Sequence, residues 1–109
     1  MNRKFIVSFG ILLFSILCSF FLSNQDVLHS ILLILTAYIK HRIYPIKKEL
    51  LWFIFICVGG AIIEISLVNI SHAWSYSNAH FFGIPIWIPL FWGVMGTTII
   101  VLYDGLTNK

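Results

Sequence analysis

Four apolar runs, each close to the length that crosses a lipid bilayer, take up most of this 109-residue chain. A membrane-spanning helix needs roughly 20 predominantly apolar residues. Only 10% of the residues are charged, whereas a water-soluble domain carries charge on about a quarter of its residues. The sequence therefore predicts an all-α integral membrane bundle of four transmembrane helices, formed as a single membrane domain over residues 1–109.

We expect the four helices at residues 5–23, 26–45, 50–70 and 85–103. The first run follows two basic residues, as the apolar part of a signal peptide would. However, bulky Phe20, Phe21 and Leu22 lie where cleavage needs small residues, which favours an uncleaved helix. The second run has Lys40 and Arg42 in its last turns. Long basic side chains can extend to the headgroups, so this run can still span the membrane.

Two prolines mark the start of the fourth run. Pro85 suits a first helical position, because the amide hydrogen that proline lacks would be unpaired there in any case. Pro89 lies one turn later, where proline removes a backbone hydrogen bond. We therefore expect Pro89 to bend or loosen the entry of this helix.

The positive charges predict how the chain is threaded. Basic residues precede the first run and recur in "KHRIYPIKK", between the second and third runs, whereas the turns after the first and third runs contain no Lys or Arg. Cytoplasmic loops are enriched in Lys and Arg, so we expect both termini in the cytoplasm of a bacterial cell. Aromatic residues typical of membrane boundaries fall at both expected ends. They are Tyr44, Trp52 and Tyr103 on the cytoplasmic side, and Trp74, Tyr76 and Trp87 on the outer side.

Several classes of function are disfavoured. The net charge of +3 lies at topology-setting positions rather than on a phosphate-binding face, so we expect no nucleic-acid partner. Cys18 and Cys57 lie in separate apolar runs and are interpreted as small apolar residues. No phosphate-binding loop, nucleophile elbow or metalloprotease motif is present in the sequence, and no cofactor is expected.

Glu64 is the acidic residue that lies inside an apolar run. A charged side chain at membrane depth costs about 2.5–3.5 kcal/mol on insertion scales, so such a residue usually has a partner or a function. Gly60 lies on the same helical face, and Gly93 and Gly96 form a matching face in the fourth run. Because small residues let helices approach closely, we expect Glu64 between the third and fourth helices.

Two roles for Glu64 remain open. It can hold the helices together through a hydrogen bond to Ser66, Asn69 or Thr97, or it can act as a proton donor or acceptor in catalysis or transport.

The stretch "HAWSYSNAHFFGIPIWIPLFWG" gathers histidines, aromatic residues and prolines before and into the fourth run. Interfacial anchoring accounts for such residues, and so does a pocket over Glu64 that opens to the outer leaflet. The candidate ligand-binding residues are His72, Trp74, Tyr76, His80, Trp87 and Trp92. We expect no metal site, because His72 and His80 share no helical face and have no Cys or Asp beside them.

A glutamate in a helix, then "AWSY", a short loop and "GIPIWIPLFWG" at the next helix resembles a layout of small bacterial inner-membrane proteins of unknown function. More loosely, it is similar to part of the carotenoid hydratase and lycopene cyclase type of membrane protein. The resemblance covers Glu64 to Gly93. In those enzymes membrane-embedded acids protonate polyene lipids, so the resemblance implies a general-acid role for Glu64.

Three functions follow as alternatives for this multi-pass inner-membrane protein. It binds a membrane lipid or isoprenoid over Glu64, it is a structural or accessory protein that forms a homo-oligomer or joins a larger membrane complex, or it is a proton-coupled small-molecule transporter that uses Glu64. Whether the chain is an enzyme is left open by its residues.

The predicted threading can be tested by labelling engineered cysteines from outside intact cells. A cysteine that replaces Ser77 should react with a membrane-impermeant thiol reagent, and one that replaces Ile46 should stay protected, because the basic connection faces the cytoplasm. The reverse pattern would show that the chain is threaded in the opposite direction.

Overall fold

The computed structural model describes residues 3–22, 25–72 and 82–107. In these residues the chain forms four α-helices, which confirms the all-α class. They are α1 (Arg3–Leu22), α2 (Asp26–Ile43), α3 (Glu49–Asn69) and α4 (Trp87–Thr107). Three of them, α1, α3 and α4, are long and apolar enough to cross a membrane. The protein is therefore a small helical membrane protein, and α2, which carries Asp26, Lys40 and Arg42, is the helix outside the set of candidate spans.

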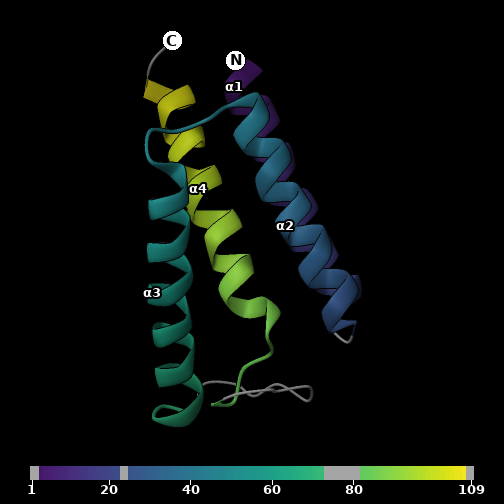
Figure 1. Ribbon diagram of the computed structural model, residues 1–109, viewed down its shortest axis with the longest axis vertical. Helices are drawn as coiled ribbons and strands as arrows, with labels where there is room; N and C mark the ends of the chain where they lie inside the picture. The colour runs from purple at the N-terminus through teal and green to yellow at the C-terminus, as the bar shows by residue number, and fades with distance from the viewer. Residues whose placement is uncertain (1–2, 23–24, 73–81, 108–109) are drawn as a thin grey trace.

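The helices alternate in direction, so both ends of the chain and the α2–α3 connection lie at the same end of the molecule (Figure 1). Helix α4 is central: it packs against α1, α2 and α3, while α2 and α3 pack on α4 rather than on each other. The molecule is 42 Å long, which matches a bilayer of about 40–45 Å including its headgroups.

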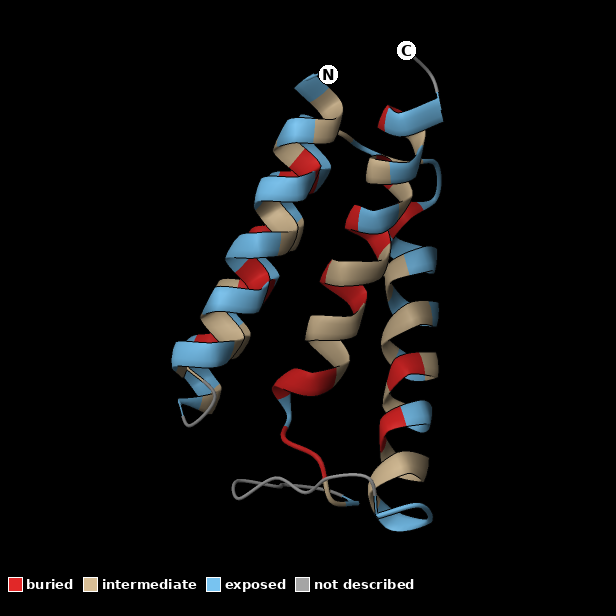
Figure 2. Cartoon of the chain, turned by 180° about the vertical axis from the view of Figure 1, so that it is seen from behind, coloured by how far each residue is buried: buried red, intermediate tan, exposed pale blue. Residues whose placement is uncertain are grey.

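Exposed residues lie on the outer faces of the helices and buried residues lie between the helices (Figure 2). Many of the exposed residues are large and apolar, and many of the buried ones are polar. Phe9, Phe14, Ile34, Phe55 and Ile62 are each at least 47% exposed. Polar and charged side chains are buried instead, among them Ser8, Ser15, His29, Thr36, Lys40, Glu49, Glu64, Thr97 and Thr98. This distribution suits lipid on the outside, because apolar side chains can face lipid while the protein interior shields polar ones from it.

Glycines bring α3 and α4 into close contact, as the sequence predicted for this pair of helices. A Cβ atom added at Gly60 would overlap the ring of Trp92. At Gly93 it would lie 2.5 Å from Sγ of Cys57, and at Gly96 2.7 Å from Cδ1 of Ile56. These separations are too short for real carbon contacts, so only glycine allows this approach.

The start of α4 corrects one expectation. The helix begins at Trp87 rather than Pro85 and continues to Thr107, beyond Tyr103. Pro89 therefore lies in the first turn, where backbone N–H groups have no acceptor within the helix. Its missing hydrogen removes no helical bond, so the predicted loosening at Pro89 was wrong. At the end of α2, Pro45 disfavours a helical conformation of the preceding residue, and the helix ends at Ile43.

Alanine substitutions at two adjacent glycines test the α3–α4 contact. Gly60→Ala should destabilise the protein by about 1–3 kcal/mol, as overpacking of a tight contact does. Gly59→Ala is the matched control, since a Cβ there would meet no atom within 4 Å, and alanine is a better helix former than glycine. Thermal unfolding in detergent micelles measures both; equal stabilities of the two variants would contradict the packing described here.

Candidate functional site

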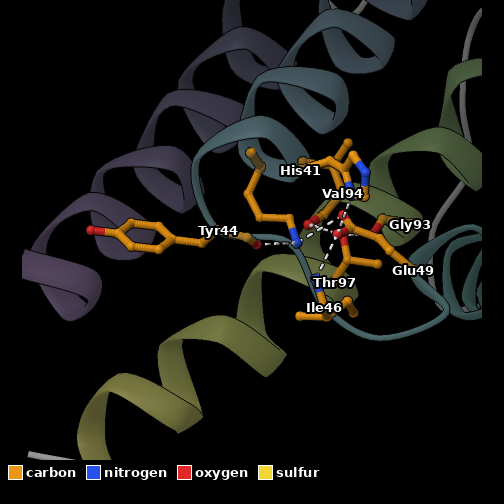
Figure 3. A network of polar contacts seen from close by, with 8 residues as sticks. His41, Tyr44, Ile46, Glu49, Gly93, Val94 and Thr97 are labelled. Atoms are coloured by element: carbon orange, nitrogen blue, oxygen red, sulfur yellow. Dashed lines mark hydrogen bonds and ion pairs between the residues drawn. The ribbon is translucent and has the colours of Figure 1, made fainter.

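A cluster of buried charges lies where α2 ends and α3 begins (Figure 3). Nζ of Lys40 lies 2.8 Å from Oε2 of Glu49 and donates to the carbonyl oxygen of Tyr44 at 3.3 Å. The other carboxylate oxygen of Glu49 is 2.9 Å from Nδ1 of His41 and accepts the backbone N–H of Ile46 at 3.1 Å. The Lys40 side chain is completely buried, and that of Glu49 is 7% exposed. This cluster fixes the connection between the two helices.

Local sequence places each of these charges favourably. Lys40 lies in the last turn of α2 and Glu49 is the first residue of α3, so each charge complements the dipole of its own helix. The sequence allowed Lys40 to extend to the headgroups, but its ammonium turns inward, because Glu49 supplies the counter-charge that a buried cation requires. Arg42 is exposed, as a headgroup-facing residue would be.

A groove of about 310 Å³ lies beside this cluster, between α2 and α3. It exists because both helices pack on α4 and leave a gap between them. Its walls are apolar apart from the end formed by the charged cluster. The lining residues are Ile34, Ala37, Tyr38 and His41 of α2, and Glu49, Leu50 and Phe53 of α3.

Glu64 lies toward the opposite end, buried between α3 and α4. Its side chain accepts a hydrogen bond from the indole N–H of Trp92, with 3.2 Å between Nε1 and Oε1, and the residue is 9% exposed. Gly60 lies one turn earlier in α3 and makes room for the Trp92 ring. The ring of Trp92 therefore covers the backbone of α3 while its N–H reaches the carboxyl group.

Two of the hydrogen-bond partners expected for Glu64, Thr97 and Asn69, donate to backbone carbonyls. The hydroxyl of Thr97 donates to the carbonyl of Gly93 at 2.8 Å, within α4. The amide of Asn69 donates to the carbonyls of Ile65 and Phe82, at 3.0 and 2.6 Å. Asn69 thus fixes the entry to α4. Glu64 accepts a hydrogen bond from Trp92, which the sequence marked only as a ligand-binding candidate.

The remaining candidate residues do not gather around Glu64 in the described part of the chain. Trp87 is 5% exposed and lies against His29 of α2, with 4.3 Å between the ring centroids. His72 is exposed at the end of α3 and has a positive φ of 52°. Trp74, Tyr76 and His80 lie outside the described residues. Within residues 3–22, 25–72 and 82–107, no three His, Cys, Asp or Glu side chains gather as metal ligands.

Sequence reasoning missed two polar contacts. The Lys40–Glu49 pair had a recognisable signal, since opposite charges lie at the facing ends of two helices joined by a short turn. His29 had a weaker one. It is fully buried, and its Nε2 lies 3.2 Å from the hydroxyl oxygen of Ser19 in α1. That contact depends on the register of α1 against α2.

No protein-family model, curated protein or solved structure matches the chain. The resemblance carried by residues 64–93 therefore stays a prediction.

Two ion pairs at the same end of the molecule allow a matched test of the buried cluster. Glu49→Gln leaves the Lys40 ammonium buried without its counter-charge and should cost about 3–5 kcal/mol of unfolding free energy. Asp104→Asn breaks the pair with Lys4, whose side chains are 37% and 43% exposed, and should cost only about 0.2–1 kcal/mol.

Denaturant unfolding in micelles measures both variants. Adding Lys40→Met to Glu49→Gln should restore much of the lost stability, because it removes the unpaired buried charge. Equal losses for the two single variants would show that the Lys40–Glu49 pair is not buried in the folded protein.

Proposed function

We propose that this chain is a multi-pass protein of a bacterial cytoplasmic membrane that binds a lipid or isoprenoid at its outer end, with Glu64 as proton donor or acceptor. The threading is supported by the exposed basic residues Arg42, Lys47 and Lys48, which belong to the same end as both termini (Figure 1). The positive-inside rule puts that end in the cytoplasm. Glu64 then lies toward the outer leaflet.

The observation that carries this proposal is a buried carboxyl group in a helix long and apolar enough to span a membrane. Glu64 lies five residues before the end of α3 at Asn69, or roughly 7–8 Å along the helix axis. Ionisable residues at such depth are rare, face the protein interior and commonly mark substrate or proton pathways. An apolar residue would fill the same space without the cost of burying a polar group.

Trp92 gives the carboxyl group a defined orientation. Its N–H donates to one oxygen of Glu64, and its ring provides a flat apolar surface beside the acid. An acid held in this way suits an apolar molecule with a polar or unsaturated centre. Transfer of a proton between Glu64 and that centre would be the chemical step, in accord with the general-acid role that the resemblance implies.

A structural role is the second candidate, because the same hydrogen bond joins α3 to α4 where Gly60 brings the helices together. In that case Glu64 only strengthens helix packing, and the chain serves as an accessory subunit of an oligomer or membrane complex. Proton-coupled transport through Glu64 stays a prediction.

Glu64→Gln separates these roles. The amide oxygen of glutamine can still accept the Trp92 N–H, so folding and insertion should be retained, while the exchangeable carboxyl proton is lost. We expect this variant to keep the wild-type melting temperature within a few degrees and to fail to restore the phenotype of a deletion strain.

Trp92→Phe is the companion variant. It removes the indole N–H and should lower stability by roughly 0.6 kcal/mol, the mean for hydrogen bonds between membrane helices.

Full complementation by Glu64→Gln would eliminate the proton-transfer role and leave the structural one.

A further inference from the structure

The groove between α2 and α3 is open at the surface of the bundle, and α3 is long and apolar enough to be surrounded by lipid chains. Ile34, Ala37, Tyr38 and His41 lie along one face of α2, at the spacing of successive helical turns. Ile34, Tyr38 and Leu50 at its rim are 52–72% exposed, and Ala37, as a small residue, leaves depth between them. A volume of about 310 Å³ lies at the lower end of the range for ligand pockets, roughly 300–1,000 Å³.

The end of the groove formed by the charged cluster is next to exposed basic residues. His41 and Glu49 line it, and Glu49 is paired with Lys40. The other acidic residue at this end, Asp104, pairs with Lys4. Exposed Arg42 follows His41 in the chain, and exposed Lys47 and Lys48 directly precede Glu49. Because both acids are matched by lysines, these three residues give the end an excess of positive charge.

We propose that this groove binds one acyl chain of an anionic phospholipid, whose phosphate lies at Arg42 and Lys47. The apolar walls accommodate the chain, and the basic end supplies the charge that a phosphate requires. Basic pockets between membrane helices recognise anionic headgroups in this manner. The site lies at the other end of α3 from Glu64, roughly 22 Å away at 1.5 Å per residue, so it is independent of the function proposed for that residue.

Charge complementarity selects a lipid over a second copy of the chain as the occupant. A helix of a second copy would bring its own basic end to Arg42 and Lys47, since the charges of this chain lie mainly at that end. Like charges so placed repel one another. An anionic phospholipid brings the opposite charge together with a chain that fits an apolar groove.

Native mass spectrometry of the full chain, with phosphatidylglycerol or phosphatidylcholine of matched acyl chains, tests the headgroup. Wild type should retain phosphatidylglycerol at concentrations at least tenfold lower than phosphatidylcholine. Arg42→Gln and Lys47→Gln should each weaken phosphatidylglycerol binding by about fivefold. Arg3→Gln is the matched control, because it removes one exposed charge from α1, a helix that contributes no lining residue to the groove, and should leave binding unchanged.

Ile34→Trp tests the groove, because it fills the groove from an exposed rim position and leaves the core intact. It should reduce phosphatidylglycerol binding at least tenfold. Leu35→Trp adds the same ring at a neighbouring exposed position and should leave binding as in wild type. Equal binding of the two lipids, or undiminished binding by Ile34→Trp, would overturn the proposal. So would efficient disulfide cross-linking between two copies that carry Leu50→Cys, since a second copy would then occupy the groove.

Discussion

The contact between the Trp92 ring and the backbone of α3 at Gly60 organises this bundle. Because glycine has no side chain, α4 approaches α3 closely enough for the Trp92 N–H to reach Glu64 one turn further along. Helix α4 also packs against α1 and α2, so it is the central helix of the bundle. Helices α2 and α3 are thereby held apart, and the groove between them follows from that separation. Both the buried acid and the groove therefore depend on how α3 packs against α4.

Much of the fold could be predicted from the sequence, because the bilayer limits the choices. Runs of apolar residues predict helices, and the small residues Gly60, Gly93 and Gly96 predicted that the third and fourth helices approach closely. The charges of Lys40 and Arg42 set α2 apart from the other three helices in the sequence, and the structure leaves α2 outside the candidate spans. These features depend on local composition, which a single sequence displays directly.

Side-chain partners were harder to predict, because they depend on the register between helices. A lysine near a helix end can extend to the headgroups or turn inward, and only the position of Glu49 at the start of α3 decides between these for Lys40. Likewise, Trp87 and Trp92 look alike in the sequence. The structure turns Trp87 toward His29 and Trp92 toward Glu64. Among the described aromatic residues, the pocket proposed beside Glu64 therefore depends on Trp92.

The central claim is that the carboxyl group of Glu64 serves a bound molecule as well as the packing of α3 against α4. Lipid analysis of the protein purified in mild detergent tests this most directly, with the surrounding membrane and the Glu64→Gln protein as references. The account predicts that an unsaturated apolar species is enriched with wild type and depleted with the variant. Identical lipid profiles in both proteins, matching that of the membrane, would contradict it.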